Sequence, residues 1–410
     1  MTTTINNEHK KLNVPNLRFP EFQGEWEKTT IGEIATIKNG PFGSVLHAED
    51  YVDEGMPIVT TEHFKSGNLP LSKNGIPQVS EDDYCRLKGY MLETDDIVFS
   101  RVGSVDINAH VEHVQQGWLF SGRVLRVRPI KSVNSLCLHY VLSTESVKRD
   151  IRNRAVGQTM PSINTPILSN TGIYMSQSEA EQKKIANLLS IIDERIATQN
   201  KIIEDLKKLK SAIIEKHYCK VEKQIACVGD LGEPFSVGNL AKDDLTETGI
   251  PCVIYGELFT TYGETISQIE SHTYKTEGII LSKKGDLLFP SSTTVDAMSL
   301  IAPSVINMDG VILGGDMFGI HISPNFNAQY LSYYFNHIAK RQLAKFAKGS
   351  TIIHLHYADI EKAKLLLPSL EEQNRMAKCL VTLDDKVKKE RTIFDLLNSQ
   401  KAYLLCHMFI

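Results

Sequence analysis

Two stretches of the chain carry the same long helical pattern of apolar positions. Residues 181–218 and 372–409 contain neither Gly nor Pro, and their apolar residues recur in alternating steps of four and three. This spacing keeps one stripe facing a partner helix. At 1.5 Å per residue each stretch predicts a helix roughly 57 Å long, too long for an ordinary core helix. The stripe positions are Ile185, Leu189, Ile192, Ile196, Ile203, Leu206 and Ile213 in the first stretch and Met376, Leu380, Leu383, Val387, Phe394, Leu397 and Leu404 in the second.

Both stripes are interrupted at the same places. Gln199 and Lys210 break the first stripe, and Glu390 and Lys401, each 191 residues later, break the second. Two heptad patterns can agree by chance, but agreement in the position of their defects is much harder to obtain by accident. The sequence therefore predicts an internal duplication. Identities also recur at Glu181/Glu372, Gln182/Gln373, Ala186/Ala377, Asp193/Asp384, Ile202/Ile393 and Leu206/Leu397.

The duplication extends into the segments that precede the helices. GMPIVTTEHF at 55–64 is matched by GIPCVIYGELF at 249–259, and DDIVFSRVGSV at 95–105 by GDLLFPSSTTV at 285–295. Short apolar runs bounded by Gly, Pro, Asn and Ser predict strands. Helical stretches at 136–155 and 329–347 make each globular domain α+β. Pro166 and Pro368 are expected to lie just ahead of the long helices, where a helix start is permitted.

Chain lengths predict how the two helices pair. The first helix ends near Tyr218 and the second domain is entered by about Gly229, so at most roughly 36 Å of chain separates them. A domain of about 150 residues has a radius of gyration near 15 Å, so the second helix begins close to the end of the first. We therefore expect an antiparallel coiled coil with pseudo-two-fold symmetry. The predicted segments are a flexible N-terminus (1–14), a first globular domain (15–178), a long helix (179–220), a second globular domain (221–370) and a second long helix (371–410).

Composition and charge restrict the function classes. The net charge of the 410 residues is −4, so any surface that attracts nucleic acid must be local. Seven cysteines are scattered and never form CxxC, which favours reduced thiols over a zinc site. The N-terminus is polar and no run approaches 18 apolar residues, so we expect a cytoplasmic protein without a membrane span.

The usual catalytic spacings are missing. The sequence has no GxxxxGK[ST] loop, no HExxH, no GxSxG and no GxGxxG after a strand. His354 and His356 alternate as on a strand face, and we interpret them as structural or surface residues rather than metal ligands. We therefore predict no catalytic residues and no metal site. An enzyme, for instance a methyltransferase fused to one DNA-reading domain, is disfavoured because the sequence lacks a cofactor-binding loop.

Local basic residues are the candidates for contact with DNA. Arg101 lies beside Gly103 and Ser104 in a turn after an apolar strand, where its guanidinium is placed either for a structural role or to pair with guanine. In SGRVLRVRP, Arg126 and Arg128 share a strand face while Arg123 points oppositely; solvated charge and phosphate contact both remain open. The segment 40–44 is either a tight turn or a loop that lets the backbone approach DNA closely.

A second basic segment lies in the other copy. Lys340, Arg341, Lys345 and Lys348 form a run with no acidic residue between 338 and 358, leading into Gly349-Ser-Thr. Small hydroxyls and lysines suit phosphates or base edges. An exposed helix face is the alternative. The Lys and Glu side chains of the long helices are interpreted as solvated flanks of the pair.

Several stretches resemble the specificity subunit of type I restriction-modification systems. VPNLRFPEFQGEWE (14–27) resembles the entry to that family's first target-recognition domain, and IKNGPFGSVLHAEDYVDEGMPIV (37–59) the loop-and-strand pattern that follows it. LLLPSLEEQNRMAKCL (365–380) resembles the family's pattern in which a strand ends at a Pro and is followed by Glu-Gln and a long helix. PSSTTVD (290–296) departs from this by lacking the Arg and Gly of SRVGSVD in the first copy. The resemblance covers almost the whole chain.

The resemblance implies a non-catalytic reader of double-stranded DNA. Each globular domain would read one half of a split target, while the paired helices fix the spacing and carry two methyltransferase subunits, joined by restriction and translocase subunits. S-adenosylmethionine would bind those partners and not this chain. A coiled-coil scaffold with two protein-binding ends is the alternative. The candidate DNA-binding residues are Lys38, Asn39, Gly43, Ser44, Arg101, Ser104, Arg123, Arg126, Gln158, Thr159, Ser291, Ser292, Thr293, Lys345, Lys348, Ser350 and Thr351.

Overall fold

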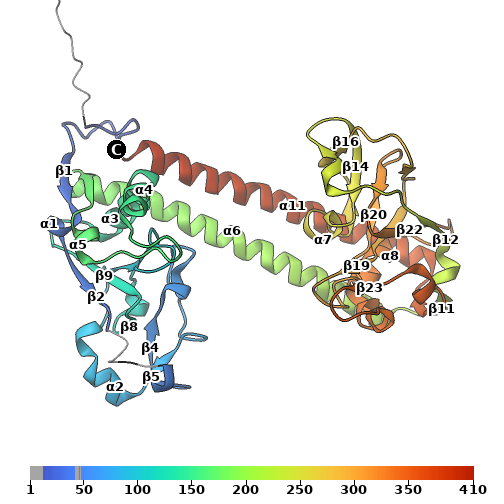
Figure 1. The fold of residues 1–410 in the computed structure, drawn as a ribbon, viewed down its shortest axis with the longest axis horizontal. Helices are drawn as coiled ribbons and strands as arrows, with labels where there is room; N and C mark the ends of the chain where they lie inside the picture. Colours follow the sequence, from blue (N-terminus) through green and yellow to red (C-terminus); the bar gives the residue numbers. More distant parts are fainter. Residues whose placement is uncertain (1–12, 42–45, 47) are drawn as a thin grey trace, which may run out of the picture. The chain divides into compact units, whose positions relative to one another are not determined.

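The computed structural model describes residues 13–41, 46 and 48–410, and these divide into two compact units. Unit 1 comprises residues up to Gln199 together with Ile393–Ile410, and unit 2 comprises Asn200–Thr392. Each unit therefore contains one globular domain and a part of both long helices. These helices are α6 (Glu179–Lys220) and α11 (Leu370–His407) (Figure 1).

Unit 1 contains two four-stranded sheets. The first has the order β2-β9-β6-β7 with antiparallel neighbours, and the second has the order β3-β5-β4-β8, in which β4 and β8 are parallel. A separate ribbon pairs β1 with β10. The strands are β1 (Glu27–Thr30), β2 (Ala35–Asn39), β3 (Tyr51–Val52), β4 (Met56–Val59), β5 (Gln78–Val79), β6 (Ile97–Ser100), β7 (Asn108–His110), β8 (Leu119–Phe120), β9 (Val124–Pro129) and β10 (Gly172–Met175).

Unit 2 repeats both sheets in the same order and adds one strand to each. The order β12-β22-β18-β20 corresponds to β2-β9-β6-β7 and is extended by β15; β13-β16-β14-β21 corresponds to β3-β5-β4-β8 and is extended by β17. The parallel pair recurs as β14 with β21. The strands are β11 (Gln224–Cys227), β12 (Gly232–Ser236), β13 (Leu245–Thr246), β14 (Ile250–Ile254), β15 (Thr265–Ile266), β16 (Ser271–Thr273), β17 (Ile280–Leu281), β18 (Asp286–Pro290), β19 (Ser292–Thr293), β20 (Ser304–Ile306), β21 (Ile312–Gly314), β22 (Met317–Ile322), β23 (Ile353–His354) and β24 (Lys364–Leu367). The matching topology confirms the predicted duplication and the α+β class.

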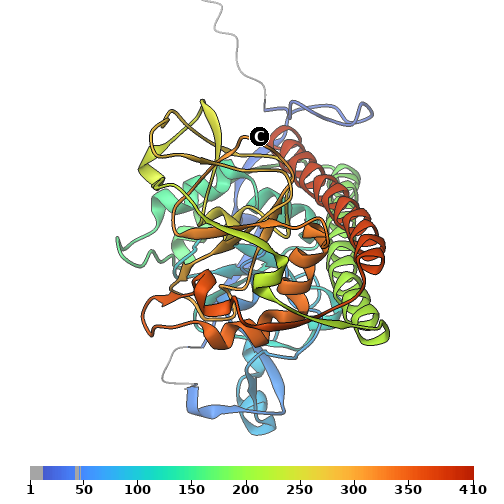
Figure 2. The ribbon, with the colours of Figure 1, turned by 90° about the vertical axis from the view of Figure 1, so that its right-hand side faces the viewer.

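Short helices cover these sheets. In unit 1 they are α1 (Ile31–Ile34), α2 (Glu81–Arg86), α3 (Ser135–Leu142), α4 (Glu145–Arg154) and α5 (Thr165–Ser169). In unit 2 they are α7 (Glu257–Thr260), α8 (Ala328–Tyr334), α9 (Lys340–Leu343) and α10 (Tyr357–Ile360). Between α8 and α9 the chain makes a π-helical turn at Phe335–Ala339, and a 3₁₀ turn at Ala344–Phe346 follows. Figure 2 looks onto unit 2 and shows its later short helices, α8 to α10, in orange beside its strands.

Three sequence expectations need refinement. The predicted helix at 136–155 is divided into α3 and α4, because Ser143 and Thr144 end one helix and begin the next. The predicted helix at 329–347 is likewise interrupted by the π-helical turn. Pro166 does not precede a long helix directly; it opens the separate short helix α5, where its fixed φ and missing N–H suit the first turn.

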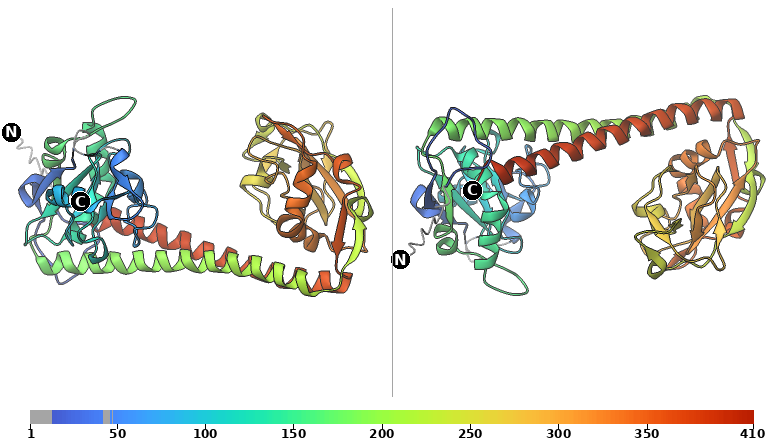
Figure 3. Two further views of the ribbon diagram at one scale, coloured as in Figure 1. Left: turned by 90° about the horizontal axis from the view of Figure 1, so that it is seen from below. Right: turned by 90° about the horizontal axis from the view of Figure 1, so that it is seen from above.

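The apolar stripes of α6 and α11 lie in the cores of both units. In unit 1, Ile185, Leu189 and Ile192 of α6 pack in one cluster with Leu404 and the residues that follow α11. In unit 2, the buried residue of α6 is Ile214, next to the predicted stripe position Ile213, which is only partly buried; Ile214 packs with Met376, Ala377 and Leu380 of α11. In both views of Figure 3 the start of α6 therefore lies beside the end of α11 in unit 1, and the end of α6 beside the start of α11 in unit 2. The antiparallel pairing predicted from chain lengths is confirmed.

A recurring glutamine ties each long helix to its globular domain. The Gln182 side chain accepts from Asn134 N at 2.7 Å and donates to Ser176 O at 2.8 Å. Gln373 makes the same pair of bonds in unit 2, accepting from Asn327 N at 2.9 Å and donating to Pro368 O at 2.9 Å. Asn134 and Asn327 are the N-caps of α3 and α8. The recurrence of this glutamine thus reflects one buried junction that is built twice.

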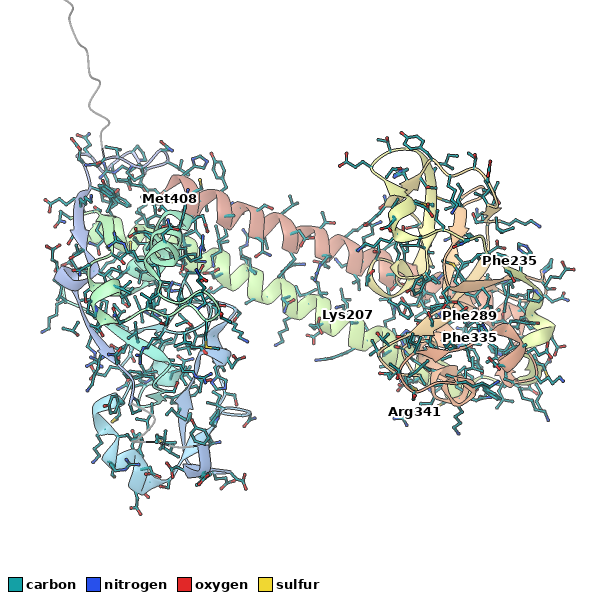
Figure 4. All side chains as sticks on the ribbon, viewed as in Figure 1. Lys207, Phe235, Phe289, Phe335, Arg341 and Met408 are labelled. Carbon is teal, nitrogen blue, oxygen red and sulfur yellow. The ribbon has the colours of Figure 1, made fainter. Side chains whose placement is uncertain are left out.

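Aromatic packing closes the two cores. In unit 2, the rings of Phe289 on β18 and Phe335 meet edge to face with centroids 5.3 Å apart (Figure 4). In unit 1, Trp26 and Phe409 make the same kind of contact at 6.0 Å, which anchors the C-terminal residues beside the first strand. Edge-to-face pairs of this kind add to the stabilisation from area burial alone.

Candidate nucleic-acid interface

In unit 1, two loops far apart in the sequence lie side by side at the end of β6. Gly103 N donates to Pro161 O, and Ile163 N donates to Arg101 O, each at 2.9 Å. The segment 156–162 is itself closed by two hydrogen bonds between Val156 and Ser162. The structure thereby brings Arg101 and Ser104 together with the exposed residues 158 and 159, four of the positions that the sequence singles out.

Unit 2 builds the same arrangement from its own residues. β19 pairs with β23, and Leu355 N donates to Ser291 O at 2.9 Å, so 291–293 lie against the loop 348–354. This loop is again closed by two hydrogen bonds, here between Lys348 and His354. The predicted residues Thr293, Lys348, Ser350 and Thr351 therefore belong to one surface region, whereas the predicted Ser291 and Ser292 are buried beneath it. Lys345 lies in the 3₁₀ turn just before it.

A cavity of about 490 Å³ opens beside the loops of unit 1. It forms where β4 and β8 end, because these strands are parallel and Val59 pairs with Phe120, so the residues that follow both strands meet at one edge. Its lining is mixed in charge, with two guanidinium groups, one carboxylate and several hydroxyls. The lining residues are Pro41, Leu46, Tyr51, Thr60, Thr61, Glu62, Arg101, Ser121, Gly122 and Arg123.

The two arginines of this cavity are held through their backbones. Arg101 N donates to Arg123 O at 2.9 Å, and Arg101 Nη1 donates to Gly122 O at 3.1 Å. Ser121 Oγ is buried and has no hydrogen-bond partner within the described residues. A buried hydroxyl of this kind favours a ligand that supplies the missing bond. The cavity is therefore suited to a polar group that accepts from guanidinium donors.

The same backbone hydrogen bond in unit 2 joins residues of different charge. Ser291 N donates to Asp316 O at 2.8 Å, and Asp316 follows β21, the counterpart of β8. Ser291 and Asp316 thus occupy the places of Arg101 and Arg123. Two donors in the first domain are replaced by a hydroxyl and an acceptor in the second. The departure of PSSTTVD from SRVGSVD seen in the sequence is therefore a change of chemistry on a conserved backbone frame.

Other predicted residues have partners within the fold. Lys38 Nζ donates to Gly89 O at 2.6 Å and lies 4.8 Å from the centre of the Tyr90 ring, so it links β2 to the 3₁₀ turn at Lys88–Tyr90. Arg128 makes a two-pronged ion pair with the fully buried Asp96, with bonds of 2.7 and 2.8 Å. These hydrogen bonds raise the pKa of Arg128. Arg128 is a structural residue, and Lys38 would have to leave its contacts to meet DNA.

The remaining candidates near β2 and β9 are placed as follows. Asn39 ends β2 with its Oδ1 buried and without a hydrogen-bond partner among the described residues. Arg126 is half-buried on the same face as Arg128, as predicted, and burial lowers its pKa. Arg123 precedes β9 and is exposed. Gly43 and Ser44 lie outside the described residues.

The basic run of unit 2 is a surface feature. Arg341 and Lys345 are exposed, and Arg341 stands at the outside of unit 2 in Figure 4. Lys348 Nζ lies 2.5 Å from Asp359 Oδ1 although its side chain is largely exposed. The expectation that His354 and His356 alternate on one strand is wrong for His356, which is the N-cap of α10. Their rings stack with centroids 6.1 Å apart.

Neither a metal centre nor a membrane helix is found in the described chain. Across residues 13–41, 46 and 48–410, no three His, Cys, Asp or Glu side chains gather as metal ligands would. Over the same residues, no helix combines the length and apolar character needed to cross a bilayer.

Sequence reasoning missed several residues of this surface. Asp316 and the cavity residues Thr60 and Glu62 gave no signal, because their role depends on strands that pair across the fold. The exposed apolar residues Met160 and Ile352 were also missed. They lie 192 residues apart, at the offset that relates Gly157 to Gly349, so the duplication itself contained the signal that would have found them.

Comparison with known proteins places both globular regions in one family. The family model described as type I restriction modification DNA specificity domain matches residues 23–208 and again residues 220–398. A putative type I restriction enzyme MjaX specificity subunit of Methanocaldococcus jannaschii is 24% identical over 93% of this chain and 92% of its own length. The MjaVIII specificity subunit of the same organism is 24% identical over 92% of this chain and 89% of its own.

Solved structures show the same fold. The type I restriction-modification S subunit from M. genitalium has a TM-score of 0.63 at 16% identity and covers 97% of this chain and 99% of its own. A structure described as the basis of complex assembly and conformational transition of the type I R-M system has a TM-score of 0.54 at 13% identity, covering 93% and 96%. The tandem arrangement is thus shared over nearly the full length of all these chains.

Proposed function

Since this chain belongs to the type I restriction-modification DNA specificity family and is a specificity subunit of such a system, we propose that its two globular domains read the two halves of a split duplex target. The observation that carries this is the loop surface built twice on one backbone frame with different side chains. A frame used twice indicates one task performed twice. The exchange of Arg101 and Arg123 for Ser291 and Asp316 indicates that the two half-targets differ.

The chemistry of each surface favours different bases. Arginine pairs bidentately with the O6 and N7 acceptors of guanine, whereas Asp accepts from the amino group of cytosine. We infer that Arg101 and Arg123 read guanine in the first half-target and that Asp316 accepts from cytosine in the second. Lys345, Lys348 and the hydroxyls of 350 and 351 are assigned to phosphates, which position the protein without reading sequence.

The paired helices are proposed to set the distance between the half-targets and to carry two methyltransferase subunits, with restriction and translocase subunits joining them. Exposed apolar residues on the helices support a docking role. In unit 1, Ile191 and Ile393 line a hollow of about 430 Å³ between α6 and α11. Contiguous exposed apolar surface rimmed by polar residues is typical of sites that bind another protein.

Catalysis and cofactor binding are assigned to those partners. We propose that the chain itself neither methylates nor cleaves DNA, and that S-adenosylmethionine binds the methyltransferase subunits. It would act in the cytoplasm, where its seven cysteines, all unpaired in the structure, stay reduced. A family model for DNA specificity domains that matches both globular regions favours this function over a scaffold with protein-binding ends.

The test is to sequence methylated adenines in cells that carry this chain with its methyltransferase partners. Exchange of residues 28–175 for those of a relative should change one half of the methylated target and leave the other intact. Arg101→Ala and Arg123→Ala should relax the first half, each by about 1–3 kcal/mol of discrimination. Arg86→Ala, which removes an exposed arginine paired with Asp83, serves as the control. A change in both halves would contradict independent readers.

A further inference from the structure

Two five-residue loops at equivalent places in the duplication share one rigid geometry. Residues 157–161 are closed by reciprocal hydrogen bonds between Val156 and Ser162, both at 2.9 Å, and residues 349–353 by the same pair of bonds between Lys348 and His354 at 2.9 and 2.7 Å. Each loop begins with a glycine in the left-handed region, with φ of 101° at Gly157 and 114° at Gly349.

The glycines are required by a close approach within each loop. A Cβ on Gly157 would lie 2.9 Å from Met160 O, and one on Gly349 would lie 2.1 Å from Ile352 O. The first loop residue therefore packs its backbone against the carbonyl of the fourth. This contact fixes where the fourth side chain is presented, and it does so twice in the chain.

In both loops this fourth residue is a large apolar side chain that the fold leaves uncovered. Met160 is 63% exposed and Ile352 is 51% exposed. The two residues between the glycine and this position are polar in both loops, Gln158 and Thr159 in one and Ser350 and Thr351 in the other. An apolar side chain that projects from a tight, hydrogen-bonded turn is not buried in the core and therefore does not stabilise the fold by burial.

We propose that Met160 and Ile352 are a matched pair of wedges that insert between neighbouring base pairs, one in each half of the duplex target, and kink the DNA there. Met and Ile are among the side chains that other proteins insert into base steps for this purpose. This inference rests on the proposed function, because it assigns a deformation of the DNA to the loops that lie beside the base-reading residues.

The surroundings of both loops favour DNA over a protein partner. Arg101 borders the first loop through the bond from Ile163, and Lys348 directly precedes the second. Basic and hydroxyl side chains donate hydrogen bonds to phosphates, and apolar side chains pack against the faces of bases. An apolar tip surrounded by basic and hydroxyl groups therefore complements stacked bases flanked by phosphates.

The wedges act independently of base sequence. The neighbouring readers differ between the domains, with Arg101 and Arg123 in one and Asp316 in the other, yet the loop geometry and the apolar residue recur. Because the loops stay the same where the base-reading residues differ, we assign them to the shape and deformability of the DNA, which proteins recognise without contacting base edges.

The experiment uses the full chain assembled with its methyltransferase subunits on a duplex that carries its methylated target. 2-Aminopurine replaces one base at a time, outside the methylated adenines, because extrusion of those bases gives its own signal. The parent complex should show increased fluorescence at one step in each half. Met160→Ala should lose the increase in the first half only, and Ile352→Ala in the second half only.

Affinity gives a second readout. Each variant should bind about tenfold more weakly, the effect of losing one buried apolar side chain. A mismatch at the kinked step should restore most of the affinity of Met160→Ala, because the step is then already unstacked. The methylated sequence should stay the same. Ile130→Ala, at the opposite end of β9 from Arg123, and Ile225→Ala on β11 remove exposed apolar residues elsewhere and should bind like the parent.

Three outcomes would overturn the wedge. Variants that bind and unstack the target as the parent does would exclude insertion. Loss of affinity reproduced by uracil in place of thymine would indicate contact with a thymine methyl group instead. Weaker assembly with methyltransferase subunits in the absence of DNA would show that the loops dock protein. If the parent complex has no preference for its target over random duplex, the proposed function itself fails; if preference persists without unstacking, only the wedge does.

Discussion

Lys210 Nζ lies 2.7 Å from Asp384 Oδ1, so the residue that interrupts the stripe of α6 forms an ion pair with α11. Lys401, the interruption in α11, makes the same contact with Asp193 of α6 at 2.5 Å. A tyrosine completes each group: Tyr333 donates to Asp384 at 2.5 Å and Tyr140 donates to Asp193 at 2.8 Å. In each unit, the lysine that interrupts the stripe of one helix pairs with the recurring aspartate of the other helix, so the same interaction is built twice.

The group in unit 2 carries an additional carboxylate. Lys210 Nζ also lies 2.9 Å from Glu264 Oε1, and His337 Nε2 lies 2.9 Å from the same oxygen. Burial acts to lower the pKa of Lys210, but the two carboxylates outweigh it and raise the pKa above its usual value. The lysine is thus charged and compensated at a position where a heptad would place an apolar residue.

Lys210→Ala should destabilise the protein by about 3 kcal/mol, because it leaves two partly buried carboxylates without their cation. Chemical denaturation measures this loss. Lys207→Ala, which removes an exposed lysine from the same helix, should cost under about 0.5 kcal/mol. Equal losses for both variants would contradict the assigned role of Lys210.

Stability should fall in acid through Glu264. Burial acts to raise the pKa of Glu264, but the hydrogen bond from His337 and the charge of Lys210 outweigh it and hold the pKa at about 2. In the unfolded chain the Glu264 carboxylate binds a proton at a higher pH, so its contribution to the free energy of unfolding is complete above about pH 4.5 and disappears as the pH falls toward 2. This contribution is on the order of 3 kcal/mol. Glu264→Gln should flatten the stability profile in that window, and a parallel profile would refute this.

Two adjacent residues of α6 provide a matched test of helix pairing. Ile192 is 5% exposed within the core of unit 1, whereas Ile191 is 53% exposed. Ile192→Lys should cost about 3–5 kcal/mol, because it buries an unpaired charge. Ile191→Lys should change the unfolding free energy by at most about 0.5 kcal/mol. Leu383, the counterpart of Ile192 in α11, is half-buried, so Leu383→Lys should fall between them. Denaturation midpoints decide the order.

The loop glycines should matter for DNA binding more than for folding. Gly349→Ala places a Cβ where Ile352 O lies 2.1 Å away and forces a left-handed φ on alanine. The strain, on the order of 1–3 kcal/mol, should be relieved by displacing the exposed loop rather than the core. We expect weaker binding to the second half-target with little change in melting temperature. Gly263→Ala, whose Cβ would meet nothing within 4 Å, is the control.

The architecture of this protein follows from features that are visible along the chain. The stripes of α6 and α11, their common defects and the offset between the copies are all local or periodic features, so they can be read without knowing any distant contact. Linker length then decided the antiparallel orientation, since an antiparallel partner needs no long crossing. Strands such as β6, β9 and β18 are predicted for the same reason, because short apolar runs between turn residues are a local signal.

Which polar residues face outward, and which already have partners within the protein, depends on contacts between distant parts of the chain. Arg128 and Lys38 looked equivalent to Arg123 in the sequence, yet Asp96 binds the first and Gly89 the second. The loops at 101–104 and 156–162 meet through an isolated bridge between Val102 and Ser162, residues that are far apart in the sequence. That bridge depends on how the whole core packs, so the composition of the surface, including Asp316 and the exposed Met160, could not be obtained from local patterns alone.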